Sequence, residues 1–338
     1  MDLASTAHAW SLPLSGERAI TNAAPSDWTV HVVRASTISD GDGGGGTSAE
    51  VLAAASDAEV YFGYGLSRQL FIAAQALRWV HSAAAGVGSL LFPEMRSSGV
   101  LLTNSARVMA DTIAEHVIGG VIFLLRSFDV AVDLQRAGAW DKEPFSGARS
   151  AVREVSECRV LVIGAGGIGS GVARRFEALG ASCVGVRRRP ELGVPQGFLR
   201  VTTLDHLDEE LSAADVLVIT SPLTSETSGL MTAARLDCLP PQAIVVNVAR
   251  GSLLDESALA ERVASGALRG AVLDVFREEP LPAESPLWGL RQVLITPHVA
   301  AVSPRKFWER EVALFLDNWS RYLEGRPLQN LVDKEAGY

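Results

Sequence analysis

The chain has 338 residues, 48% of them hydrophobic, and a formal net charge of −9 at pH 7. This length predicts two domains, each large enough for its own apolar core. The negative charge disfavours nucleic acid as a partner, because it repels the phosphate backbone.

Targeting and metal signals are missing from the sequence. The N-terminus lacks a basic start followed by an apolar stretch, so we expect no signal peptide. The longest apolar segment, Val117–Leu125, is too short to cross a bilayer. Cys158, Cys183 and Cys238 lie far apart, without the spacing of a metal site. We therefore expect a cytoplasmic protein with no metal and no membrane partner.

The first part of the chain alternates short apolar segments with helical patterns. Apolar runs predict strands at Trp28–Ala35, Ala58–Gly65, Leu77–Gly88 and Gly99–Asn104. Between the first two, the glycines of Asp40–Ser48 indicate a flexible surface loop. A helix is predicted over Asp111–Arg126, followed by a polar connector at Asp141–Ser150.

From Cys158 onward the alternation of strands and helices becomes regular. Strands are predicted at Arg159–Ile163, Cys183–Val186, Val216–Thr220, Ala243–Val248, Ala271–Val275 and Val293–Thr296. This pattern is typical of a parallel sheet with helices on both faces. A last helix is predicted over Phe307–Leu323.

A G-x-G-x-x-G pattern at Gly164, Gly166 and Gly169 lies between a predicted strand and a predicted helix, Ile168–Leu179. In a dinucleotide fold the first glycine makes a tight turn, the second admits the pyrophosphate and the third lets helix pack on strand. The phosphates would lie at the positive end of the helix. A purely structural turn is the alternative.

Three arginines, Arg187, Arg188 and Arg189, follow the second strand where an acid would bind the ribose of NAD. A guanidinium binds a 2′-phosphate through charge-assisted bonds. We therefore predict NADP(H) as the preferred cofactor, with NAD(H) as the second choice and a solvated basic loop as the alternative reading.

Polar residues follow the later strands at the edge where open parallel sheets bind ligands. Arg250 suits a substrate carboxylate, and His298 suits acid–base chemistry. Glu279 would hold the imidazole and favour its protonated form. The alternatives are an internal partner for Arg250, a core position for His298 and a solvated position for Glu279.

The stretches "VLVIGAGGIG", "SPLTSETSGLM", "NVARGSLLDESAL", "GALRGAVLDVFREEPLPAESPLW" and "VLITPHVA" resemble the D-2-hydroxyacid dehydrogenase family, and "TNSARVMADTIAEH" is most similar to its glyoxylate/hydroxypyruvate reductase branch. The resemblance implies that Arg250, Glu279 and His298 are catalytic: Arg250 binds the 2-oxo acid, His298 donates the proton and Glu279 orients His298. It also implies that a turn at Ala85, Gly86 and Val87 binds the substrate carboxylate through backbone amides.

The resemblance, with the glycine motif and the strand ends, implies one cofactor-binding set. Its members are Gly164, Gly166, Gly167, Ile168, Gly169, Arg187, Arg188, Arg189, Ser221, Pro222, Thr227, Val248, Ala249, Asp274 and His298. Within this set, Asp274 would bind the nicotinamide carboxamide.

The family fold implies a Rossmann doubly wound parallel sheet domain, residues 105–302, inserted into a smaller flavodoxin-like α/β substrate domain, residues 1–104 and 303–338. Members are usually homodimers, and the segment from Phe128 to Trp140 would be part of that contact.

The sequence therefore predicts an NADPH-dependent reductase of small 2-oxo acids such as glyoxylate or hydroxypyruvate, working in either direction. One alternative is a specialised-pathway dehydrogenase acting on a phosphorus oxyacid or phosphonate. Another is a nucleotide-sensing interaction protein of the corepressor type.

Overall fold

The computed structural model describes residues 1–35 and 48–337, which divide into two compact units. Unit 1 comprises the described residues of 1–109 and 302–337, and unit 2 comprises residues 110–301. The predicted boundaries lay at 104/105 and 302/303. The substrate and dinucleotide roles assigned to the two units stay predictions.

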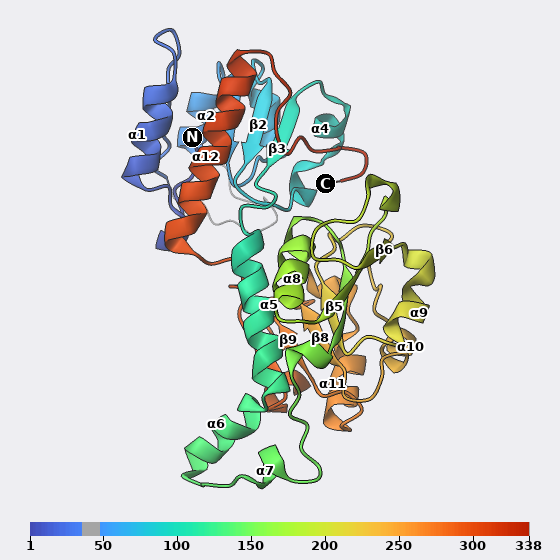
Figure 1. Ribbon diagram of the computed structural model, residues 1–338. Helices are drawn as coiled ribbons and strands as arrows, with labels where there is room; N and C mark the ends of the chain where they lie inside the picture. The colour runs from blue at the N-terminus through green and yellow to red at the C-terminus, as the bar shows by residue number, and fades with distance from the viewer. Residues whose placement is uncertain (36–47, 338) are drawn as a thin grey trace. The chain divides into compact units, whose positions relative to one another are not determined.

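Unit 1 is built on a parallel sheet. Among its described residues, three strands pair in the order β1 (Val60–Gly63), β2 (Trp79–Ser82) and β3 (Leu101–Asn104). Its helices are α1 (Leu14–Ala23), α2 (Ala49–Ala55), α3 (Arg68–Ala73), α4 (Pro93–Ser97) and α12 (Pro304–Leu323). The C-terminal helix α12 packs beside α1 (Figure 1).

The two faces of this sheet carry separate apolar cores, because side chains alternate along each strand. Val80 and Leu102 point into a core shared with α2, α3 and α4. Phe62 and Trp79 point to the opposite face, where Phe315 of α12 stacks on both rings. This burial explains why the last helix of the chain belongs to the first unit.

Unit 2, which is described throughout, holds a seven-stranded parallel sheet in the order β10-β9-β8-β7-β4-β5-β6. The strands are β4 (Arg159–Ile163), β5 (Ser182–Val186), β6 (Arg200–Thr202), β7 (Val216–Ile219), β8 (Ile244–Asn247), β9 (Gly270–Leu273) and β10 (Val293–Ile295). The parallel-sheet α/β fold class and the Rossmann topology predicted from the sequence are confirmed.

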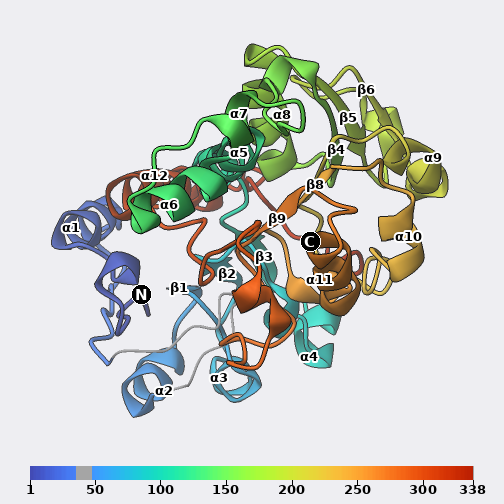
Figure 2. The ribbon, with the colours of Figure 1, turned by 90° about the horizontal axis from the view of Figure 1, so that it is seen from below.

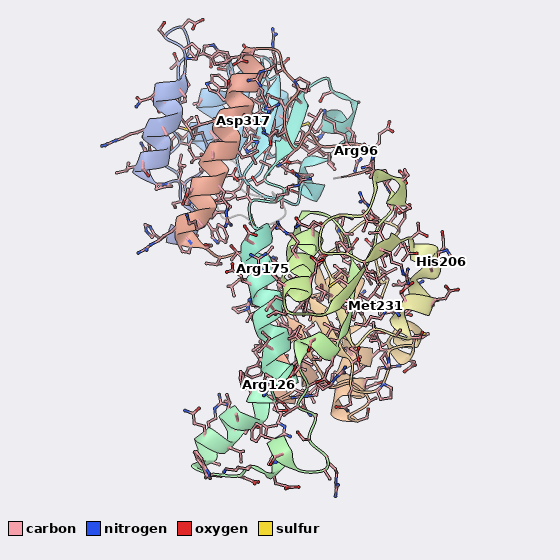
Figure 3. The ribbon with its side chains drawn as sticks, in the orientation of Figure 1. Arg96, Arg126, Arg175, His206, Met231 and Asp317 are labelled. Atoms are coloured by element: carbon pink, nitrogen blue, oxygen red, sulfur yellow. The ribbon has the colours of Figure 1, made fainter. Side chains whose placement is uncertain are left out.

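Helices cover both faces of this sheet. They are α5 (Ala110–Leu125), α8 (Gly167–Ala178), α9 (Leu207–Leu211), α10 (Ala233–Asp237) and α11 (Glu256–Ala264). Two further helices of the unit, α6 (Phe128–Ala137) and α7 (Glu143–Ser146), stand away from the sheet (Figure 1). Figure 2 shows α5 and α8 on one face and α10 and α11 on the other. Arg175 of α8 lies against α5, where it bonds Asp111 and Glu115 (Figure 3).

The structure corrects the prediction of a strand at Trp28–Ala35, because these residues form no regular strand. A strand needs a ladder of backbone hydrogen bonds, and the place beside β1 is taken by Asp2, which bridges to Gly63. Val33 donates only to the Met1 carbonyl. The predicted loop Asp40–Ser48 lies, apart from Ser48, outside the described residues.

One strand was missed. β6 has three residues, begins with an arginine and pairs with β5 at the sheet edge. Such a short edge strand has no apolar pattern to reveal it. None of the helices in the described ranges combines the length and apolar composition that crossing a membrane requires.

Candidate functional site

The strand order of unit 2 reverses direction at β4. The chain builds β4, β5 and β6 toward one edge, then returns to add β7 on the other side of β4. Ligands of open parallel sheets bind at the carboxyl ends of the two strands that flank such a reversal. Gly164 directly follows β4, and Ser221 lies two residues beyond β7. The glycine motif therefore lies at the reversal.

Each glycine of the motif has a distinct environment. Gly164 has φ 106°, and a Cβ built there would lie 2.7 Å from the Ser221 nitrogen. A Cβ on Gly169 would lie 2.1 Å from the Gly164 carbonyl oxygen, so this glycine lets α8 approach the turn. A Cβ on Gly166 would meet no atom within 4 Å. The backbone beside Gly166 is therefore open to a ligand.

The N-terminus of α8 can bind an anion. Gly166 is its N-cap and offers no side chain to the amides of the first turn. The backbone N–H groups of Gly167, Ile168 and Gly169 lie in that turn, where the helix dipole favours negative charge. Open space beside Gly166 and a 12-residue helix fit the pyrophosphate of a dinucleotide.

The three arginines follow β5, on the neighbouring strand. Arg187 is half-buried; its backbone N–H donates to the Thr202 carbonyl and its Nη1 donates to the Gly193 carbonyl at 3.0 Å. Arg188 and Arg189 are exposed. The strand end thus has a guanidinium where a carboxylate would bind unphosphorylated ribose.

The other predicted cofactor residues line strand ends, with structural contacts of their own. The buried Thr227 hydroxyl donates to the Pro222 carbonyl at 2.7 Å and so holds the loop that starts at Ser221. Val248 and Ala249 follow β8 and are buried, so they offer their backbone rather than a side chain.

Asp274, directly after β9, is almost fully buried and holds the loop that carries His298. Its Oδ1 accepts hydrogen bonds from the Thr296 hydroxyl at 2.6 Å and from the Val299 N–H at 2.8 Å. Its Oδ2 accepts from the Ala300 N–H at 2.9 Å. Its role toward a carboxamide stays a prediction.

His298 and Glu279 form a hydrogen-bonded pair, and its acid–base role stays a prediction. His298 Nδ1 lies 2.9 Å from Glu279 Oε2, and each side chain is 37% exposed. Glu279 is fixed by its other oxygen, Oε1, which accepts from the Phe276 N–H at 2.9 Å. In the part of the chain that the structure describes, His298 Nε2 has no hydrogen-bond partner. The imidazole is therefore oriented through one nitrogen, Nδ1.

Arg250 lies on a loop that touches the loop of Glu279. The next residue, Gly251, packs so closely that a Cβ there would lie 1.9 Å from the Phe276 carbonyl carbon. The Arg250 guanidinium is half-buried and donates to the Ala249 carbonyl at 2.6 Å. Arg250 therefore lies next to the Phe276–Glu279 segment, whose Glu279 contacts His298.

Glu256, at the start of α11, supports the same segment. Its Oε1 accepts from the Arg277 N–H at 2.6 Å. Burial raises the pKa of Glu256, and the charge of Glu279 raises it further, while the bond from Arg277 lowers it.

The predicted substrate turn belongs to unit 1. Ala85, Gly86 and Val87 follow β2, and the Ala85 carbonyl accepts from Asn104 Nδ2 at 2.8 Å. Their substrate-binding role stays a prediction.

Sequence reasoning missed several residues that hold the site. Thr296 and His116 make side-chain contacts around Asp274, and Gly251 and Glu256 fix the neighbouring loops. The sequence offered two signals for these residues: Thr296 ends a predicted strand, and Gly251 directly follows Arg250. Nothing in the helical pattern around His116 marked its partner.

Known proteins match this chain in sequence and in fold. Residues 118–300 match the family model for the D-isomer specific 2-hydroxyacid dehydrogenase, NAD binding domain. The chain is 33% identical over 271 residues to glyoxylate/hydroxypyruvate reductase A of Klebsiella pneumoniae strain 342, covering 78% of this chain and 83% of that protein.

It is also 29% identical over 290 residues to D-3-phosphoglycerate dehydrogenase of Methanocaldococcus jannaschii, covering 85% of this chain. The chain spans only about half of that relative, 54% of its length. Among solved structures, a D-isomer specific 2-hydroxyacid dehydrogenase from Xanthobacter autotrophicus Py2, in complex with NADPH and MES, is similar with a TM-score of 0.76 and 30% identity. That match covers 96% of this chain and 95% of the other.

Proposed function

This chain belongs to the D-isomer specific 2-hydroxyacid dehydrogenase family, and from that premise we propose that it reduces a small 2-oxo acid with NADPH. The substrate is of the glyoxylate or hydroxypyruvate type, and the product is the D-2-hydroxy acid. The similarity to a glyoxylate/hydroxypyruvate reductase over most of both chains supports this substrate class.

The observation that carries the proposal is the His298–Glu279 pair, held 2.9 Å apart on a segment that packs against the Arg250 loop. A carboxylate that accepts from Nδ1–H stabilises the imidazolium and directs Nε2–H toward a reacting oxygen. A neighbouring guanidinium binds a carboxylate and stabilises negative charge that develops on the carbonyl oxygen.

The reduction also requires a hydride donor, which is the cofactor and not a residue of the chain. When bound, NADPH supplies the hydride that the carbonyl carbon accepts. His298 Nε2 gives its proton to the carbonyl oxygen, and Glu279 keeps the imidazolium oriented during the transfer. Arg250 holds the 2-oxo acid so that the oxygen faces His298.

The residues present fit a phosphorylated dinucleotide. Backbone amides at the start of α8 suit the pyrophosphate, and Gly166 leaves room for it. Arg187, Arg188 and Arg189 suit the 2′-phosphate, and a similar solved structure contains NADPH.

The first prediction tests His298 as the proton donor. We expect His298→Gln to lower kcat for glyoxylate by about 10²–10⁴-fold, because general acid catalysis is worth that much. The Kd of NADPH, measured by fluorescence titration, should change far less than kcat, because the predicted phosphate contacts, at the α8 N-terminus and the three arginines, do not involve His298. His206→Gln is the matched control, because His206 is an exposed histidine of the same unit.

Wild-type rates in His298→Gln would contradict the assignment of His298 as the proton donor.

A panel of 2-oxo acids, with 3-phosphohydroxypyruvate included, identifies the substrate through NADPH absorbance. The reverse reaction with NADP⁺ and 2-hydroxy acids, phosphite or phosphonates tests the specialised-pathway alternative. Failure of all these substrates to turn over would favour the nucleotide-sensing alternative.

The second prediction concerns the cofactor. We expect kcat/KM to favour NADPH over NADH, and Arg188→Ala with Arg189→Ala to lower kcat/KM for NADPH by about 10- to 100-fold, the range for lost charge-assisted bonds. The value for NADH should barely change. Arg136→Ala on α6 is the control. A wild-type preference for NADH would refute the 2′-phosphate assignment.

A further inference from the structure

His116 of α5 has no part in the function proposed above, yet its side chain reaches the Asp274 network. Its Nε2 lies 3.2 Å from the Thr296 hydroxyl. That hydroxyl lies 2.6 Å from Asp274 Oδ1. His116 is half-buried, so its ring is partly shielded from water. Three side chains from one helix and two strand ends thus form a continuous hydrogen-bonded row.

The fold explains why these residues meet. Asp274 follows β9 and Thr296 follows β10, which are neighbouring parallel strands with Leu273 opposite Ile295. Helix α5 lies close on this part of the sheet, because Gly120 has no side chain: a Cβ there would lie 2.6 Å from Val272 Cγ1. Gly120 is one helical turn after His116, so the close approach brings the imidazole to the strand ends.

Counting donors assigns the direction of each bond. A threonine hydroxyl has one proton to give. Both Asp274 oxygens accept backbone N–H bonds, and the bond from the Thr296 hydroxyl to Asp274 Oδ1 is shorter than its contact with His116, so the hydroxyl proton goes to Asp274. Thr296 Oγ1 can then only accept from His116. His116 must therefore have a hydrogen on Nε2.

The row ends on the loop that carries His298. Asp274 accepts hydrogen bonds from the backbone of Val299 and Ala300, and the His298 N–H donates to the Asp274 carbonyl at 2.8 Å. His298 itself has φ 54°, in the left-handed region that a non-glycine residue adopts only when its surroundings hold it there. The Asp274 carboxylate is the anchor that holds it.

We propose that His116 is a positioning residue for proton transfer: its Nε2–H fixes the Thr296 hydroxyl on Asp274, and so fixes the loop that presents His298. The inference rests on the proposed reductase function, because His298 is the acid in that function. His116 touches neither substrate nor the reacting atoms in this role.

The kinetic test uses paired variants. We expect His116→Leu, which keeps the bulk and loses the donor, to lower kcat about tenfold, which corresponds to ~1.4 kcal/mol. We expect His116→Gln to restore kcat to within about threefold of wild type, because its amide nitrogen replaces the Nε2 donor. The Kd of NADPH should change much less than kcat in both, because the row reaches the predicted cofactor site only at Asp274 and leaves the backbone amides of the α8 N-terminus and the arginines untouched.

A double-mutant cycle shows whether His116 acts through Thr296. Thr296→Val should lower kcat about as much as His116→Leu, and the double variant should be no slower than either, because both substitutions break one row. Additive losses would overturn the inference, and so would a His116→Gln variant as slow as His116→Leu. A merely space-filling role for His116 predicts no rescue by glutamine.

A spectroscopic measurement decides the inference without turnover. Long-range ¹H–¹⁵N correlation spectra of ¹⁵N-histidine protein, with His116 assigned from the His116→Gln spectrum, should show the Nε2–H form at pH 8. The amide resonances of Val299 and Ala300 should shift more in His116→Leu than in His116→Gln.

A neutral Nδ1–H form, or unmoved amides at Val299 and Ala300, would overturn the inference. If no 2-oxo acid reacts with the wild-type protein, the proposed function fails in the kinetic arm, while the tautomer and the amide shifts still decide the bonding row. The two failures are therefore distinguishable.

Discussion

At the scale of single residues, the site depends on positions where a side chain would not fit. Gly251 lies between the Arg250 cation and the backbone that holds Glu279, and its hydrogen-only side chain allows the two loops to touch. Catalytic geometry is lost when a reacting group moves by about 1 Å. A methyl group between these loops would therefore affect both folding and catalysis.

We expect Gly251→Ala to reduce the free energy of unfolding by about 2 kcal/mol, in the range of other overpacked sites. Its Cβ would lie 1.9 Å from the Phe276 carbonyl carbon, so the loop must shift and kcat should fall at least about tenfold. Thermal unfolding and steady-state kinetics measure the two effects. Gly289→Ala is the control, because a Cβ there meets nothing within 4 Å. An unaltered melting temperature and kcat in Gly251→Ala would contradict the packing argument.

At the scale of elements, the N-terminus of α8 contains one glycine required for packing and one that faces open space. Gly169 is needed for the helix to pack on the turn after β4, whereas Gly166 faces open space. Both belong to the same motif, but only Gly169 is required by the packing of the protein itself, and Gly166 is predicted to face the cofactor. A substitution at Gly166 therefore tests cofactor binding with little effect on folding.

We expect Gly166→Ala to keep the wild-type melting temperature within a few degrees and to raise the Kd of NADPH about tenfold or more, the cost of a lost charge-assisted bond. The new methyl group meets no protein atom within 4 Å, so it occupies only the ligand's space. Fluorescence titration with NADPH measures the affinity. Gly119→Ala, also free of contacts and within α5, should bind NADPH normally. Unchanged affinity in Gly166→Ala would argue against a pyrophosphate at this helix end.

At the scale of the whole molecule, unit 2 has an extension formed by α6 and α7. Of the residues in these two helices, only Asp129 is buried. Helices α6 and α7 stand away from the sheet (Figure 1). Between them Trp140 is 92% exposed, and Phe128, at the start of α6, is 47% exposed. The extension is anchored at its base by the buried pair of Arg269 and Asp129, whose Nη2 and Oδ1 lie 2.6 Å apart. A rigidly anchored arm with exposed aromatic rings is suited to contact a second copy of the chain.

We expect the protein to be a homodimer, with light scattering giving about twice the chain mass of 35.9 kDa. Trp140→Asp should shift the distribution toward monomer, because aromatic anchors often contribute ~2 kcal/mol or more to an interface. Leu14→Asp changes an exposed apolar residue of unit 1 and should leave the mass unaltered. A monomeric wild type, or a Trp140→Asp protein that stays fully dimeric, would refute this role.

Much of the fold was predictable because its signals are local. Buried parallel strands appear as short apolar runs, and the predicted Arg159–Ile163 coincides with β4. The predicted strand at Trp28–Ala35 was wrong because pairing depends on which segment takes the sheet edge, and Asp2 takes it. The three-residue β6 was missed because edge pairing needs no apolar pattern.

The sequence by itself determined the family, the sheet class and the strand ends that precede Arg250 and His298, because glycine spacing and apolar alternation are properties of neighbouring residues. Only the tertiary structure decided how those groups are held. The 2.9 Å bond from His298 to Glu279, the loop bound by Asp274 and the reach of His116 to Thr296 join residues 19 to 180 positions apart. Such contacts depend on which strands are neighbours and how closely a helix lies on them, and no local pattern encodes either.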